Sequence, residues 1–222
     1  MTLATVNPEG RPTARMVICR GLDVREGWLV FYTDRESAKG RALDVNPYAA
    51  LVFHWDAHER QARIEGPVTL APDPDSDAYW NSRPRDARIA AVASDQSRPI
   101  ESRAAFLAKV EREAKRPGDD IPRPKRWGGY RVWAERVELW VGQPARAHDR
   151  ALWTRALAPS GDGFRGGPWR STRLQPRSRP ASRASRPPRP RPGSRDGRVV
   201  APRPSCSSAS RARSTPCGRP RA

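Results

Sequence analysis

Residues 27–55, GWLVFYTDRESAKGRALDVNPYAALVFHW, hold two apolar, aromatic-rich runs on either side of a polar segment. The first and the last seven residues have the length and the β-branched and aromatic content of strands. Between them, residues 34–47 predict a short helix, with Asp34 or Ser37 near its start and an Asn-Pro pair at its end. The stretch therefore predicts a strand, a helix and a strand.

The segments on either side of this stretch also have the pattern of strands. Before it, residues 2–6 (TLATV) and 11–21 (RPTARMVICRG) flank the turn residues NPEG, which predicts a β-hairpin. After it, residues 60–72 predict a further strand, in which Gly66 and Pro67 mark a bulge or a bend. Three strands, a helix and two strands in this order favour an antiparallel barrel over a doubly wound sheet.

The second half of the domain predicts helices followed by strands. Helices are expected at 73–84, 85–94 and 102–117, and strands at 128–142 and 167–176. The expected fold class is mainly β with peripheral helices (α+β), in one domain that covers residues 1–176. Since Met1 lies at the first strand and leaves no residues to cover that edge, we expect an N-terminal segment to be missing from this domain.

Residues 177–222 differ sharply in composition from the rest. They contain 13 Arg, 9 Pro, 9 Ser and one Asp, with almost nothing apolar to bury, so we expect a disordered tail. The tail has a net charge of 13 minus 1, or +12, which leaves +6 of the formal +18 for residues 1–176. Because Arg, Pro and Ser without any Lys are typical of a GC-rich frame that was never selected to fold, a frameshift or an unrelated extension is the preferred interpretation.

The formal charge of +18 raises the question of nucleic-acid binding. The tail has no aromatic residue to stack on bases, and no recognisable binding module lies beside it, which disfavours that class. Cys19, Cys206 and Cys217 have no spacing typical of a zinc site or a disulfide framework. No signal peptide opens the chain and no apolar run approaches the roughly 18 residues of a membrane span, so a cytoplasmic location is expected.

Cations and hydroxyls gather in two segments that could hold a phosphate. Residues 15–20 (RMVICR) have an arginine at each end, and residues 32–40 (YTDRESAKG) carry hydroxyls and Lys39 near a helix start. The alternative is a set of solvated charges beside strands. A dinucleotide fingerprint, a P-loop, a nucleophile elbow and a metal-ligand spacing of histidines are all absent from the sequence, so no metal site is expected.

Six sequence blocks, in this order and at this spacing, resemble the pyridoxamine 5'-phosphate oxidase family. The blocks are RMVICR (15–20), FYTDRESAKG (31–40), ERQARIEG (59–66), DAYWNSRPRDARIAAVASDQS (77–97), WGGYRV (127–132) and VELWVGQPARAHDR (137–150). The resemblance covers nearly all of residues 2–176. It implies an FMN-binding split β-barrel, a homodimer with FMN at the subunit interface, and oxidation of pyridoxamine or pyridoxine 5'-phosphate to pyridoxal 5'-phosphate, with dioxygen as acceptor and hydrogen peroxide released.

The same resemblance implies roles for individual residues. The implied FMN contacts are Arg15, Met16, Val17, Ile18, Cys19, Arg20, Tyr32, Thr33, Lys39, Gln61, Gln96, Ser97, Trp140 and Arg150. The implied substrate contacts are Arg20, Tyr79, Arg83, Arg146 and His148. Arg146 and His148 are the expected catalytic pair, which meets the pyridine ring over the flavin. If the segment stays extended, Arg146, His148 and Arg150 point to the same side and can share one cleft.

Several positions depart from the family pattern. Arg20 stands where the family usually has Lys, Ala38 replaces an Arg that contacts the FMN phosphate, and Ala87 replaces a Ser that contacts the substrate phosphate. The other departures are Leu139, Val141 and Ala147. They leave two alternatives open, a related split-barrel FMN oxidase that acts on another ring, as in phenazine assembly, and a flavin-binding protein with impaired catalysis.

Overall fold

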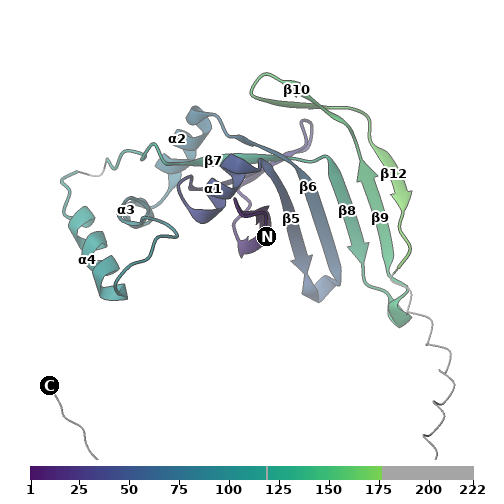
Figure 1. The fold of residues 1–222 in the computed structure, drawn as a ribbon, viewed down its shortest axis with the longest axis horizontal. Coiled ribbons are helices and arrows are strands. Elements are labelled where there is room, and N and C mark those ends of the chain that lie inside the picture. The colour runs from purple at the N-terminus through teal and green to yellow at the C-terminus, as the bar shows by residue number, and fades with distance from the viewer. Residues whose placement is uncertain (119, 177–222) are drawn as a thin grey trace, which may run out of the picture. The chain divides into compact units, whose positions relative to one another are not determined.

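The computed structural model describes residues 1–118 and 120–176. The predicted disorder of residues 177–222 concerns residues outside this description. Within it, the strand pairings are antiparallel and the helices lie beside the sheet (Figure 1). The predicted class, mainly β with peripheral helices, is confirmed.

The strands of the described residues form one large sheet and a separate hairpin. Their bounds are β1 (Thr2–Val6), β2 (Pro12–Met16), β3 (Gly21–Asp23), β4 (Trp28–Asp34), β5 (Tyr48–Trp55), β6 (Arg60–Leu70), β7 (Trp127–Trp133), β8 (Arg136–Val141), β9 (Asp149–Thr154), β10 (Leu157–Ser160), β11 (Gly163–Gly166) and β12 (Arg170–Arg173). The large sheet has the order β12-β9-β8-β6-β5-β1-β2, with β7 joined to β6 and to the pair β4-β3. Strands β10 and β11 form the hairpin.

Strand β6 belongs to both parts of the large sheet. It pairs with β8 from Arg60 to Glu65 and with β7 from Val68 to Leu70. The change of partner falls at Gly66 and Pro67, where a Cβ on Gly66 would lie 1.8 Å from the carbonyl oxygen of Trp133. Because β5 pairs with β6 in unbroken register across this point, the predicted irregularity is a change of partner and not a bulge.

The helices of the described residues are short, and prolines or hydroxyl caps set their starts. They are α1 (Ala38–Val45), α2 (Asp73–Ser82), α3 (Arg85–Ala93) and α4 (Arg103–Ala114), with the 3-10 turns η1 (Asp56–His58) and η2 (Pro144–Arg146). Helix α1 begins after Ser37, whose side chain accepts a hydrogen bond from the backbone N of Gly40, and it ends at Asn46, as predicted. The predicted helices at 73–84, 85–94 and 102–117 are confirmed as α2, α3 and α4.

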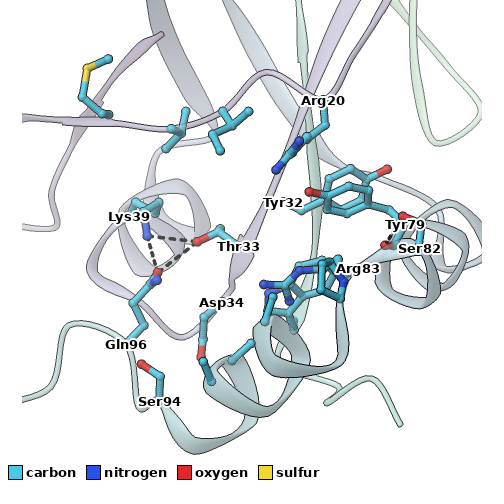
Figure 2. A pocket seen from close by; sticks show the side chains of 18 of the residues that line it. Arg20, Tyr32, Thr33, Asp34, Lys39, Tyr79, Ser82, Arg83, Ser94 and Gln96 are labelled. Carbon is cyan, nitrogen blue, oxygen red and sulfur yellow. Dashed lines mark hydrogen bonds between the residues drawn. The ribbon is translucent and has the colours of Figure 1, made fainter. Parts of the chain in front are cut away.

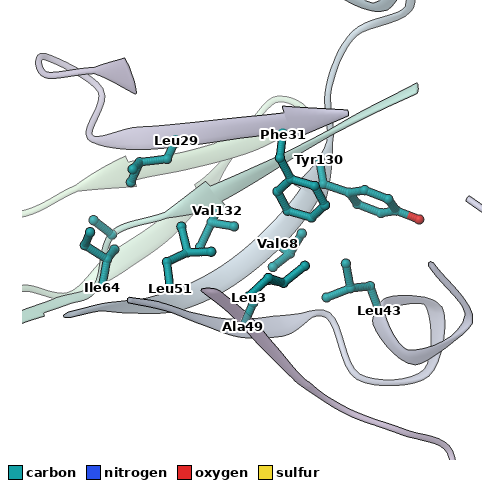
Figure 3. Close-up of a cluster of buried hydrophobic side chains, with 11 residues drawn as sticks. Leu3, Leu29, Phe31, Leu43, Ala49, Leu51, Ile64, Val68, Tyr130 and Val132 are labelled. Atoms are coloured by element: carbon teal, nitrogen blue, oxygen red, sulfur yellow. The ribbon is translucent and has the colours of Figure 1, made fainter. Parts of the chain in front are cut away.

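The main core lies among strands β1, β4, β5, β6 and β7, and α1 contributes Leu43 to it. Figure 3 shows the side chains that fill it, from Leu3 of β1 to Leu43 of α1, with the stacked rings of Phe31 and Tyr130 at 5.5 Å between centroids. The alternating apolar residues of the strands supply this cluster because successive side chains point to opposite faces. A second cluster, built on Trp80, Ile89, Ile121 and Trp127, packs the helices against the end of β7.

Three segments differ from the sequence predictions. Residues 11–21 contain two strands, β2 and β3, separated by residues 17–20. Residues 128–142 also fall into two strands, because the chain changes neighbours at Ala134 and Glu135. The third segment, residues 149–166, contains β9, β10 and β11, for which the sequence analysis predicted no strands. In β10 and β11 the short segments contain Pro and Gly, which are depleted in strands.

Candidate functional site

A cleft of about 750 Å³ opens between the segment after β2, the end of β4, and the helices α1 to α4. Figure 2 shows its side chains converging from these elements. The structure brings ten of the predicted site residues together in its lining, namely Met16, Val17, Ile18, Arg20, Tyr32, Thr33, Lys39, Tyr79, Arg83 and Gln96.

Lys39 lies at one end of the cleft, in the first turn of α1. Its Nζ donates hydrogen bonds to Thr33 Oγ1 at 3.0 Å, Ser37 Oγ at 3.1 Å and Gln96 Oε1 at 2.5 Å. Burial, and then the charge of Arg15, lower the pKa of Lys39 to about 8. A group so placed favours a bound anion, which would restore the charged form.

Stacked aromatic rings form the other end of the cleft. The ring of Tyr32 lies 4.2 Å from that of Tyr79 and 5.7 Å from that of Trp127. The guanidinium of Arg20 lies 5.3 Å from the centre of the Tyr79 ring, a cation-π contact. This wall presents a cation at its edge.

Arg83 lies between α2 and α3, where the following Pro84 holds its backbone extended at φ −77° and ψ 144°. Its guanidinium sits 5.2 Å from the centre of the Trp80 ring and 4.9 Å from that of Trp127. Burial lowers its pKa, and its buried Nη1 has no hydrogen-bond partner in the structure. An unpartnered buried donor with a positive charge is suited to a ligand oxyanion.

The cleft lining carries an excess of positive charge. Its cations are Arg20, Lys39 and Arg83, and its acid is Asp34. Asp34 is paired with Arg126, whose Nε lies 3.0 Å from Asp34 Oδ2. The charge of this carboxylate is therefore compensated from outside the lining, and the cleft is suited to an anionic ligand.

A second group, which we call the corner, lies on β6, β8, β9 and the segment from the turn η2 to β9. It consists of five predicted residues, Gln61, Trp140, Arg146, His148 and Arg150. Gln61, Trp140 and Arg150 lie opposite one another in a row across these three strands. The imidazole of His148 lies 4.8 Å from the Trp140 ring, and its Nδ1 accepts a hydrogen bond from the backbone N of Gln143. The lining of the cleft includes no residue of the corner, and Figure 1 shows β8 and β9 on the far side of β5 and β6 from α3 and α4.

The condition stated for Arg146, His148 and Arg150 to point to the same side, a regular extended segment, is not met. Arg146 ends the 3-10 turn η2, and both Ala145 and Arg146 have left-handed backbone, with φ of 56° and 61°. Strand β9 begins only at Asp149. The two-residue alternation of a strand therefore does not decide where Arg146 points, although His148 and Arg150 remain neighbours of Trp140.

Arg150 is tied to a buried carboxylate in the corner that the sequence reading did not single out. Glu138 of β8 is 3% exposed and lies between Arg63 of β6 and Arg150 of β9. The distances are 2.7 Å from Arg63 Nη2 to Glu138 Oε2 and 2.6 Å from Arg150 Nη2 to Glu138 Oε1. Its position in the sequence gives one indication of this role, because Glu138 is the single acid in the apolar run VELWV. An acid that is buried in such a strand needs a cationic partner. Trp127, which lines the cleft, also went unnamed within its block.

Three predicted residues lie in neither group. Arg15 turns back onto the β1-β2 hairpin and donates to Thr5 Oγ1 at 2.8 Å and Thr13 Oγ1 at 2.7 Å. Cys19 packs against the core, and Ser97 is exposed with φ of 69°. Their roles toward a cofactor stay predictions.

Two family models match the chain along the described domain. Residues 1–116 match the model of pyridoxamine 5'-phosphate oxidase, and residues 127–176 match that of the pyridoxine 5'-phosphate oxidase C-terminal dimerisation region. Among curated proteins, the pyridoxine/pyridoxamine 5'-phosphate oxidase of Gluconobacter oxydans is 47% identical over 79% of this chain and 83% of its own length. The protein of the same name from Burkholderia multivorans is 50% identical over 79% of this chain and 78% of its own length.

Solved structures support the same fold. PhzG from Burkholderia lata, in complex with tetrahydrophenazine-1-carboxylic acid, has a TM-score of 0.68 and 27% identity, and the match covers 79% of this chain and 81% of that one. A pyridoxamine 5'-phosphate oxidase-related, FMN-binding protein from Nostoc punctiforme has a TM-score of 0.59 and 25% identity, over 79% of this chain and 86% of that one. The predicted split β-barrel is thus confirmed.

Across residues 1–118 and 120–176, the helices are too short or too polar to cross a membrane.

Proposed function

Because the chain belongs to the pyridoxamine 5'-phosphate oxidase family, we propose that it binds FMN and oxidises pyridoxamine or pyridoxine 5'-phosphate to pyridoxal 5'-phosphate. With the amine substrate, one dioxygen and one water are consumed, and ammonia and hydrogen peroxide are released. The curated relatives carry this activity in their names. The cleft supplies the chemical argument for it.

One observation carries the proposal, the buried Nη1 of Arg83, which has no hydrogen-bond acceptor. Burial also lowers the pKa of this arginine, so an anionic ligand gains a charge-assisted hydrogen bond without displacing a carboxylate. Arg20 and Tyr79 lie within the same lining and can donate to the same phosphate. Substrates that carry a phosphate fit this end of the cleft.

The residues near Lys39 fit the second phosphate, that of FMN. The ammonium of Lys39 and the hydroxyl of Thr33 can donate to phosphate oxygens, and the Gln96 amide offers both a donor and an acceptor. When bound, FMN would supply the two-electron chemistry, taking a hydride from the substrate carbon and passing electrons to dioxygen. The protein would fix both phosphates and exclude water between the rings.

A homodimer would complete the site, since the cleft and the corner do not meet within the described chain. The match to a dimerisation region at residues 127–176 includes Trp140, Arg146, His148 and Arg150. In our proposal the corner of one protomer faces the cleft of its partner, with FMN at the interface. Trp140 and Arg150 would then contact the flavin, while Arg146 and His148 would orient the substrate and stabilise charge on it.

A second candidate is oxidation of another anionic ring. Helix α3 lines the cleft with Ala87, Ala90 and Ala91, which leave an apolar wall beside Arg83. PhzG, whose structure contains a tetrahydrophenazine carboxylic acid, has the same fold. A carboxylate in place of a phosphate could pair with Arg83, so the charge on the substrate does not separate the two candidates.

The test compares substrates on one FMN-saturated preparation. Flavin reduction is followed without oxygen, first with pyridoxamine 5'-phosphate and then with unphosphorylated pyridoxamine. We expect rapid bleaching with the phosphate ester and little with the free amine. Bleaching by a tetrahydrophenazine carboxylate alone would favour the second candidate, and purified protein that cannot retain flavin would reject both.

A further inference from the structure

Glu138 is a buried anion that lies beside the row of Gln61, Trp140 and Arg150, two positions away along β8. It lies two residues before Trp140 on β8, so both side chains project from the same face. At 3% exposure, a carboxylate is stable only when it is paired and hydrogen-bonded. Arg63 and Arg150 provide that pairing from the two neighbouring strands.

The three guanidinium nitrogens of Arg150 all have acceptors. Nε and Nη2 contact Glu138 Oε1 at 2.8 and 2.6 Å, and Nη1 donates to the carbonyl of Gln175 at 3.2 Å. The backbone adds a further tie, because Leu174 N donates to Arg150 O at 2.9 Å. A free arginine side chain loses rotamer entropy when it is immobilised. Here the immobilisation is present before any ligand binds.

We propose that Glu138 is a positioning residue, which holds the guanidinium of Arg150 in the orientation that contacts the flavin. The inference rests on the proposed function, in which Arg150 meets FMN across the dimer interface. Preorganised groups bind with a smaller ordering cost than mobile ones, so loss of Glu138 should weaken flavin binding through Arg150. Glu138 itself need not touch the cofactor.

Glu65 offers a matched control on the same face of the sheet. Its carboxylate lies 2.8 Å from Arg63 Nε and 3.8 Å from Arg136 Nε, and no contact joins it to Arg150. Glu65→Gln therefore removes one charge from the network around Arg63 without releasing Arg150. Glu138→Gln removes one charge of the same kind from the side chain that holds Arg150, and so weakens that hold.

The experiment is a double-mutant cycle on the full-length chain, with the FMN dissociation constant measured by flavin fluorescence quenching. Glu138→Gln should raise that constant about tenfold, which is about 1.4 kcal/mol, and Glu65→Gln should leave it unchanged. In an Arg150→Ala background, Glu138→Gln should add nothing further. The visible absorption spectrum of flavin bound to Glu138→Gln should match that of the Arg150→Ala variant.

Additive effects of Glu138→Gln and Arg150→Ala, or an equal loss in Glu65→Gln, would overturn the inference. Should Glu138→Gln not fold, as judged by circular dichroism, Glu138→Asp keeps the charge but draws the carboxylate back from Arg150. That variant should show a raised dissociation constant in the wild-type background and no effect in the Arg150→Ala background. Wild-type protein that binds no FMN would reject the proposed function, whereas normal binding by both Glu138 variants would reject the positioning role alone.

Discussion

In the cleft, Arg83 lies over two indole rings with a buried nitrogen that has no hydrogen-bond partner, whereas in the corner Arg150 is held by Glu138 and Gln175. The two arginines therefore have different electrostatic surroundings. An uncompensated cation attracts charge from a distance, and a compensated one offers donors in a fixed direction. In our proposal, the charge of the cleft therefore sets the affinity for phosphate, and the fixed side chains of the corner set the orientation of the bound ligand.

The largest effect should follow from removing the uncompensated cation. Arg83→Ala should lower kcat/KM for pyridoxamine 5'-phosphate by about 100-fold, mainly through KM, because one or two charge-assisted hydrogen bonds of about 1.5 to 3 kcal/mol are lost. FMN affinity should not change. Steady-state peroxide release checks this, with Arg103→Ala on the exposed start of α4 as the control. An unchanged KM would remove the distinction between the two arginines.

Substitutions in the corner should have a smaller effect, which falls on the rate of flavin reduction and not on the retention of FMN. Arg146→Ala and His148→Ala should leave the protein yellow but slow flavin reduction by at least about tenfold, since groups that orient a substrate contribute on this scale or above it. Anaerobic stopped-flow on FMN-saturated variants separates the chemical step from cofactor loss. Normal reduction rates in both variants would show that the corner does not act on the substrate.

Next in size is the contribution of Lys39 to flavin binding. Lys39→Ala should raise the FMN dissociation constant about tenfold, or about 1.4 kcal/mol. Colourless Lys39→Arg protein at neutral pH would contradict a purely electrostatic role, since arginine keeps the positive charge.

The lowered pKa of Lys39, about 8, adds a pH dependence with a definite sign. As the pH rises through this value the ammonium loses its proton, so FMN affinity should fall above it. Bound phosphate favours the charged form and shifts the fall upward. Fluorescence titrations from about pH 7 to about pH 10 should show the decline in wild-type protein and a flatter profile in Lys39→Arg, because the pKa of an arginine lies above about 12.

The smallest effect, none, is expected from deletion of residues 177–222. Both groups of site residues, and the carbonyl of Gln175 that holds Arg150, lie before this point. Melting temperature and flavin content should therefore match those of the full chain. A cooperative loss of stability on deletion would show that the tail contributes to the domain.

The sequence predicted much of the cleft and less of the corner. Around the cleft, Ser37 caps α1 and Pro84 separates α2 from α3, so local signals place Lys39 and Arg83. In the corner, the left-handed backbone at Ala145 and Arg146 has no local signal, because neither residue is Gly or Asn. The alternation of side chains along a strand therefore does not apply to Arg146 and His148.

Long-range pairing explains the other omissions. Glu138 becomes informative only when β6 and β9 bring two arginines to it, from positions 63 and 150. The change of partner at Gly66 was visible as a glycine next to a proline, but its cause, the close approach of Trp133, depends on a residue far along the chain. Local sequence patterns do not show which distant segment will pack against a given residue in the folded protein.

The dual pairing of β6 also has a consequence for biosynthesis. Strands β5 and β6 are neighbours in sequence and can pair early, but β7 and β8 reach β6 only when residues 127–141 have been made. A nascent chain that ends before them already carries the cleft cations Arg20, Lys39 and Arg83, yet lacks Trp127 and the strand that spaces β4 from β6. On the ribosome, cofactor loading would thus have to wait until the last third of the described domain emerges.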